Sequence, residues 1–134
     1  MASEMHISFP GGKKVYADFK GMEIPTDQPI KEGGDGSAPQ PFMLFLTSMV
    51  TCAGIYVLSF CDKRNISTEG IRIVQKHEYN AKGKLEKVTI EIVVPPEFPE
   101  KHINTLTRVA DLCAVKRTIL DSPEFETRTV VATS

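Results

Sequence analysis

The chain has 134 residues, 41% of them hydrophobic and 25% charged, which predicts one soluble globular domain over residues 1–134. Its formal net charge of −1, with no block of lysines and arginines, argues against a nucleic-acid partner. Three cysteines do not fit a secreted disulfide framework, and the first residues lack the pattern of a signal peptide. We therefore expect a cytoplasmic protein.

The first 41 residues predict strands followed by an irregular loop. Stretches 5–9 and 13–19 flank Pro10-Gly11-Gly12, a pattern typical of a β-hairpin, and a third extended piece is expected at 22–24. The stretch 24–41 contains four prolines and three glycines, so it cannot form regular structure. Loops this long in a compact domain often serve a function or an interface.

A long apolar segment follows this loop. Residues 42–60 predict a helix that is apolar nearly all round, and such a helix belongs in the interior of a protein. The segment is also long enough to span a bilayer. However, threonines, serines and a glycine dilute its apolarity, and the strands elsewhere in the chain need a packing partner. We therefore favour a buried helix and expect no membrane association.

The second half of the chain predicts a hairpin, a helix and a final strand. Stretches 71–79 and 85–94 alternate as strands, and residues 80–84 join them. Helical spacing then runs from Glu100 to Ser122-Pro123, and residues 125–132 read as a last strand. The order ββ-α-ββ-α-β indicates an α+β fold with antiparallel pairing and helices on one face.

The three cysteines differ in their expected geometry. Cys52 and Cys61 leave opposite sides of the first helix, on the order of 13 Å apart along its axis, too far for a disulfide. Cys61 lies at the polar end of that helix, where we expect it to be incidental.

Cys52 and Cys113 each lie on an apolar helix face, which makes them a candidate redox pair. Free cysteines are also commonly buried as small hydrophobic residues, so both interpretations stay open. Lys116 and Arg117 follow Cys113 by three and four residues. They could polarise a nearby sulfur or form a solvated helix edge.

No metal or cofactor site is predicted. His6, His77 and His102 are scattered over two strands and a helix start, without the spacing of a zinc site. The sequence contains no phosphate-binding glycine loop and no nucleophile elbow, so we expect no cofactor.

Two segments resemble a known family. GGDGSAPQPFMLFLTSMVTCAG, residues 33–54, resembles the segment that defines the OsmC/Ohr family: a Gly-rich loop, a proline, and an apolar helix with a cysteine in its middle. ADLCAVKRTI, residues 110–119, is similar to the second family motif, with its cysteine on the second long helix. The resemblance covers essentially the whole chain. It implies the OsmC-like fold, with antiparallel sheets around two long central helices, in an intertwined homodimer whose active sites lie at the subunit interface.

The resemblance also implies a chemistry. In the peroxidase members the first cysteine, here Cys52, attacks a hydroperoxide and becomes a sulfenic acid. The second, here Cys113, resolves it as a disulfide, which a dithiol such as a lipoylated protein reduces. Those members also use a glutamate near the start of the first helix and an arginine from the N-terminal part. Here Phe42 and Met43 occupy the first region, and no arginine precedes Arg64.

Two functions from different classes fit these features. The first is a thiol-dependent redox enzyme that reduces organic hydroperoxides through Cys52 and Cys113. The second is a non-catalytic binding protein that holds a small apolar or thiol-reactive ligand at the dimer interface. Its pocket would be lined by the cysteines and by Phe42, Met43, Phe45 and Met49. Such side chains are equally suited to filling a core.

Overall fold

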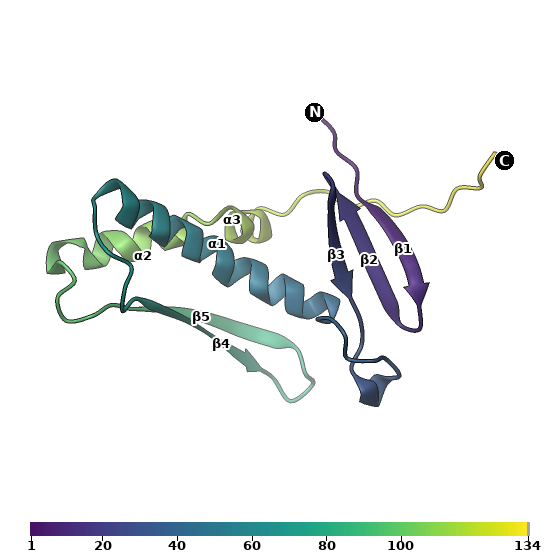
Figure 1. Ribbon diagram of the computed structural model, residues 1–134, viewed down its shortest axis with the longest axis horizontal. Coiled ribbons are helices and arrows are strands. Elements are labelled where there is room, and N and C mark those ends of the chain that lie inside the picture. The colour runs from purple at the N-terminus through teal and green to yellow at the C-terminus, as the bar shows by residue number, and fades with distance from the viewer. Residues whose placement is uncertain (134) are drawn as a thin grey trace. The chain divides into compact units, whose positions relative to one another are not determined.

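The protein combines small antiparallel sheets with helices, as the computed structural model shows for residues 1–133 (Figure 1). This confirms the predicted α+β class. The chain forms two compact units, Met1–Ser48 and Met49–Ser134, called here the first and second units. The expectation of a single domain stays a prediction.

The first unit contains a three-stranded antiparallel sheet in the order β1-β2-β3. The strands are β1 His6–Gly11, β2 Lys14–Phe19 and β3 Met22–Thr26. Gly12 lies between β1 and β2 with a φ of 57°, a conformation that glycine adopts without steric cost. The predicted hairpin and the third extended piece are therefore confirmed.

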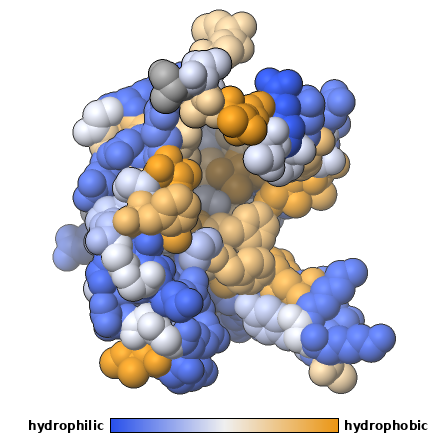
Figure 2. Space-filling view, turned by 90° about the vertical axis from the view of Figure 1, so that its right-hand side faces the viewer, coloured by the Kyte–Doolittle hydropathy of each residue, from blue (hydrophilic) through white to orange (hydrophobic). Residues whose placement is uncertain are grey.

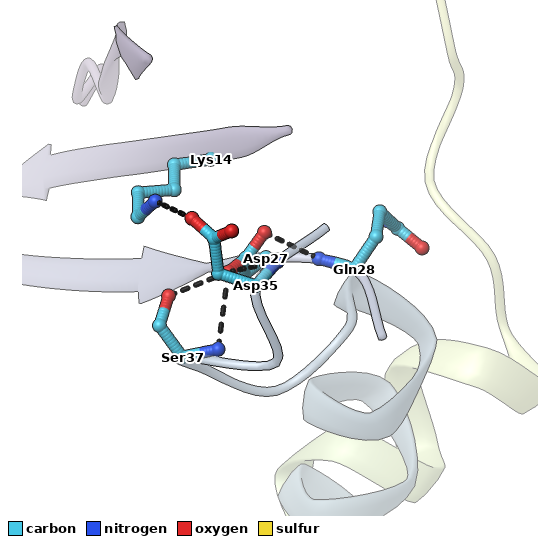
Figure 3. A network of polar contacts seen from close by, with 5 residues as sticks. All are labelled: Lys14, Asp27, Gln28, Asp35 and Ser37. Atoms are coloured by element: carbon cyan, nitrogen blue, oxygen red, sulfur yellow. Dashed lines mark hydrogen bonds and ion pairs between the residues drawn. The ribbon is translucent and has the colours of Figure 1, made fainter. Parts of the chain in front are cut away.

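The loop after β3 is irregular, as predicted, apart from the short 3-10 helix η1, Ile30–Glu32. It is organised around the fully buried carboxylate of Asp27 (Figure 3). One oxygen of this group accepts the N–H groups of Asp35 and Ser37 and the Ser37 hydroxyl, and the other accepts the N–H of Gln28. These hydrogen bonds lower the pKa of Asp27 to about 2, and the bond from the Ser37 hydroxyl contributes most. An ionised carboxylate thus holds the Gly-rich loop in one conformation.

The second unit packs helices on one face of a hairpin (Figure 1). Helix α1, Pro41–Lys63, begins in the first unit, and its residues from Met49 onward belong to the second. The hairpin pairs β4, Arg72–Tyr79, with β5, Leu85–Val93, in antiparallel register. The chain continues through η2 Glu100–His102, α2 Ile103–Asp111 and α3 Ala114–Leu120.

The core of the second unit lies between α1, α2 and the hairpin. Ala53, Val57 and Phe60 form the buried stripe of α1, and Leu106 and Ala110 that of α2. The hairpin contributes apolar side chains of both strands, among them Ile73, Ile90 and Ile92. The strand alternation predicted for 71–79 and 85–94 is therefore confirmed.

The prediction that the first long helix is interior on nearly all sides is wrong. Only one stripe of α1 is buried, while Ile55 and Leu58 are 52% and 40% exposed. The physical reason is that the hairpin and α2 cover a single side of the helix. Figure 2 shows apolar side chains exposed at the surface beside hydrophilic ones. By length and composition α1 could cross a membrane, but its buried stripe packs as that of a core helix.

Two other predictions in the second half are wrong. The expected continuous helix breaks after Asp111, because Cys113 adopts non-helical backbone angles, φ −44° and ψ 125°, and caps a separate helix, α3. The expected last strand, 125–132, is not formed. Its apolar side chains are exposed, Phe125 at 84% and Val131 at 92%. A strand needs a neighbouring strand for its backbone hydrogen bonds. Among the described residues of this single chain, no strand pairs with this stretch.

Candidate active site

The structure brings Cys52 and Cys113 together within the second unit. Cys52 lies in α1 and is partly buried, whereas Cys113 lies at the start of α3 and is 2% exposed. The two thiols lie close enough to shift each other's pKa. The two sulfurs that the sequence picked out as a candidate pair are thus neighbours.

The position of Cys113 is fixed by contacts of its own sulfur. Its Sγ accepts the N–H of Lys116 at 3.4 Å and so caps the first turn of α3. The same thiol lies 3.9 Å from the carbonyl oxygen of Met49, one turn before Cys52 on α1. Burial raises the pKa of the Cys113 thiol, so it stays protonated at neutral pH.

The neighbourhood of Cys52 favours a thiolate. Burial by itself raises the pKa of Cys52, but hydrogen bonds outweigh it. These come from the backbone N–H groups of Val115 and Ala114 and from the Cys113 thiol, and the charge of Arg117 adds to them. The pKa of Cys52 therefore lies below the ordinary value, while that of Cys113 lies above it. This polarises the pair into a nucleophile and a proton-bearing thiol.

Arg117 is expected to contribute to this polarisation. In the variant Arg117→Leu we expect the pKa of Cys52 to rise, because the positive charge that favours the thiolate is removed. Thiolate absorbance at 240 nm across a pH titration measures the change. Arg108→Leu is the matched control, since that exposed arginine of α2 bonds to Thr105. Equal titration curves for the two variants would contradict this role of Arg117.

A cavity of about 680 Å³ lies beside Cys113. Its walls come from α1, β5, α2 and α3, and they are mostly apolar, with Met49, Ala53, Ile90 and Ala110 among them. Lys116, held by Asp111 at 2.7 Å, also borders it. The site therefore joins a polarised thiol pair to a space that suits an apolar ligand.

The four residues predicted to line a pocket belong to both units. Met49 borders the cavity beside Cys113. Phe42, Met43 and Phe45 belong to the first unit and are exposed, with the two phenylalanine rings 5.5 Å apart. The role of these three side chains in a ligand pocket stays a prediction.

The third cysteine lies near the C-terminal end of α1, directly before Asp62 and Lys63, as predicted. Its side chain is nevertheless fully buried in the core of the second unit. Burial raises the pKa of its thiol, so Cys61 is an inert core residue. Among residues 1–133 no group of three histidine, cysteine or acidic side chains could hold a metal ion.

Sequence comparison matches residues 34–128 to the family model described as OsmC-like protein, a range that includes Cys52, Cys113 and the last part of the loop before α1. The chain belongs to the OsmC-like family. No curated protein matches it significantly.

Solved structures agree with the OsmC-like fold. A candidate osmotic stress induced and detoxification response protein from Psychrobacter arcticus is 21% identical, with a TM-score of 0.71 and coverage of 88% of both chains. An OsmC-like protein from Mycoplasma pneumoniae is 11% identical, with a TM-score of 0.68 and coverage of 91% of this chain and 89% of that one. The organic hydroperoxide resistance protein OsmC from Legionella pneumophila is 15% identical, with a TM-score of 0.54 and coverage of 89% of both chains.

Proposed function

We propose that this OsmC-like protein reduces organic hydroperoxides through a Cys52 sulfenic acid and a Cys52–Cys113 disulfide. The observation that supports this most is the polarised pair: a partly exposed cysteine, Cys52, with a lowered pKa beside a buried one, Cys113, with a raised pKa. The Legionella pneumophila protein of the same fold is named an organic hydroperoxide resistance protein, which also supports this proposal.

The first step uses the Cys52 thiolate as nucleophile. Its sulfur attacks the terminal oxygen of R–O–OH, the O–O bond breaks, and the alkoxide leaves and takes a proton from solvent to give ROH. Cys52 is thereby oxidised to a sulfenic acid. The N–H groups of Ala114 and Val115 lower the pKa of Cys52. They therefore stabilise the thiolate before the attack.

The second step uses Cys113. Its sulfur attacks the sulfenic sulfur of Cys52, the S–O bond breaks, and hydroxide leaves with the thiol proton as water. The product is a disulfide between two cysteines that already lie close enough to shift each other's pKa. A dithiol reductant, such as a lipoylated protein, then restores both thiols.

The chain has its own means of holding the thiolate. It lacks the glutamate near the helix start and the N-terminal arginine that peroxidase members use. In the second unit the amides of Ala114 and Val115 and the charge of Arg117 act on Cys52. We propose that this set takes the place of the missing pair.

The protein is proposed to work as a homodimer in the cytoplasm. The exposed side chains Ile55 and Leu58 on α1 and the unpaired stretch 125–132 are surfaces that a second copy would cover. Sedimentation equilibrium should give twice the mass of one chain, and a monomer at micromolar concentration would contradict the proposal.

One equivalent of cumene hydroperoxide tests the proposed reaction. Reduced protein should lose two thiols, and peptide mapping should find Cys52 joined to Cys113. The reason is that Cys52 has a lowered pKa and lies near the Cys113 thiol, whereas Cys61 is buried in the core. Persistence of both thiols for minutes at neutral pH would refute the reaction.

A second function is supported by the cavity of about 680 Å³, whose apolar walls suit a small ligand without any reaction. In that case the protein would be a carrier for an apolar or thiol-reactive molecule. Native mass spectrometry of protein purified from its host should then show a bound small molecule. Repeated absence of such a molecule would exclude the carrier function.

A further inference from the structure

Lys116 contacts both sides of the break between α2 and α3. Its side-chain Nζ lies 2.7 Å from a carboxylate oxygen of Asp111, the last residue of α2. Its backbone N–H donates to the sulfur of Cys113, the N-cap of α3, at 3.4 Å. A single residue of α3 therefore links the end of one helix to the start of the next.

The start of α3 matters because it lies against α1 close to Cys52. The Cys113 thiol is 3.9 Å from the carbonyl oxygen of Met49, which belongs to the turn of α1 just before Cys52. The backbone N–H groups of Ala114 and Val115, in the first turn of α3, lower the pKa of Cys52. Such groups favour a thiolate only while they point at it. The direction of α3 therefore determines how well the Cys52 thiolate is stabilised.

The position of Asp111 is unfavourable for α2 itself. A carboxylate in the last turn of a helix lies at the negative end of the helix dipole, which costs stability. Aspartate is also a weak helix former. The contact with Lys116 offsets these costs, because it joins α2 to α3. An acidic residue at this position is therefore explained by the helix that follows and not by α2.

We propose that Lys116, through its ion pair with Asp111, is a positioning residue that holds α3 in the direction that serves Cys52. The inference rests on Cys52 as the nucleophile of the proposed function and adds which side chains maintain its surroundings. Both side chains act through the backbone of α3. They are partly exposed, Lys116 at 45% and Asp111 at 63%, so the expected effect is that of a surface ion pair.

The sign of the change separates positioning from a direct effect of charge. The groups of α3 and its N-cap whose charge or thiol acts on Cys52 are Arg117 and Cys113. If Asp111 acted by its charge alone, its removal would take away a negative charge and lower the pKa of Cys52. If it acts by holding α3, its removal raises that pKa, because the N–H groups turn away from the sulfur.

Asp111→Ala is therefore the decisive variant. Alanine is a better helix former and removes the unfavourable charge from the end of α2, so thermal unfolding should show a fold at least as stable. We nevertheless expect the pH midpoint of Cys52 alkylation by iodoacetamide to rise by about half a unit, roughly a threefold loss of reactivity below the midpoint. Peptide mapping assigns the alkylation to Cys52. An unchanged or lowered midpoint would overturn the inference.

Substitutions of Lys116 provide a second test. Lys116→Met keeps the length and the helix propensity of the side chain but loses the contact with Asp111, so the midpoint should rise at least as far. Lys116→Arg keeps a cation that reaches Asp111 and should retain the wild-type midpoint. The double variant Asp111→Ala/Lys116→Met should rise no further than Lys116→Met, because both changes remove one contact. Additive rises would show that the two side chains act separately, against the proposal.

Asp121→Ala is the matched control. Asp121 is an exposed aspartate at the C-cap of α3, where its backbone N–H donates to the carbonyl oxygen of Arg117. Alanine keeps this bond, so the midpoint of Cys52 should stay at the wild-type value. Equal rises in Asp111→Ala and Asp121→Ala would overturn a specific role of the ion pair.

The outcomes separate this inference from the proposed function. Alkylation uses no peroxide, so a rise in Asp111→Ala supports the positioning role even where hydroperoxide fails to oxidise Cys52. If hydroperoxide does oxidise Cys52 and the midpoint of Asp111→Ala equals that of the wild type, only the positioning role fails. If the midpoint of wild-type Cys52 is no lower than that of a free cysteine, both proposals are overturned.

Discussion

Replacing Cys52 with serine is expected to lower the rate of hydroperoxide reduction at least about 1000-fold, because the alcohol is far less nucleophilic than the thiolate. Consumption of cumene hydroperoxide with dihydrolipoamide in excess measures the rate. Cys113→Ser should lose turnover but keep the first step, with a sulfenic acid accumulating on Cys52 that dimedone labels. Serine is a favoured N-cap, so this variant preserves the start of α3.

Cys61→Ala is the control for these substitutions. It also removes a thiol from α1, but this one is fully buried in the core with a raised pKa. We expect a loss of stability of roughly 1 kcal/mol, in proportion to the small group deleted, and unchanged activity per folded molecule. Activity in Cys52→Ser, or its loss in folded Cys61→Ala, would contradict the assignment of the nucleophile.

Gly34→Ala is expected to destabilise the first unit by about 3 kcal/mol. A Cβ at this position would overlap the carbonyl group of Gln28 and lie 2.9 Å from the carboxylate of Asp27. Because the obstacle is backbone, it cannot turn aside as a flexible side chain would. Urea unfolding followed by circular dichroism measures the loss, and the Asp27 hydrogen bonds should open with it.

Gly36→Ala is the matched control for this loop. Gly36 has a φ of 64°, and a Cβ there meets no atom within 4 Å. The substitution therefore costs only the strain of a positive φ, about 1 kcal/mol. If the two alanine variants lose the same stability, the overlap with Gln28 is not what requires glycine at position 34.

Local sequence was sufficient to predict most of the regular structure. The hairpin turns contain their own signals, such as Gly12 and residues 80–84, and the apolar run fixed α1. Two elements depend on contacts distant in the sequence. No residue near Leu112 is a strong helix breaker by propensity. The break is instead stabilised by the Cys113 sulfur, which accepts the N–H of Lys116 and lies near the carbonyl oxygen of Met49. The stretch 125–132 has the residue pattern of a strand, but this pattern does not show which strand it would pair with.

The two cysteines of the candidate site could be predicted from the sequence, but the backbone groups that donate hydrogen bonds to Cys52 could not. Cys52 and Cys113 stand out because they are chemically distinctive residues on apolar helix faces. The N–H groups of Ala114 and Val115 leave no trace in the sequence, since every residue except proline has one. Their role follows from the helix break, which places them against Cys52.

The rate of Cys52 alkylation by iodoacetamide as a function of pH tests the central claim most directly. The hydrogen bonds from α3 and Cys113 predict that Cys52 reaches half its maximal rate at a lower pH than a free cysteine in an unstructured peptide. The same measurement on Cys113 should give a higher midpoint. A Cys52 midpoint at or above that of the free peptide would contradict the account.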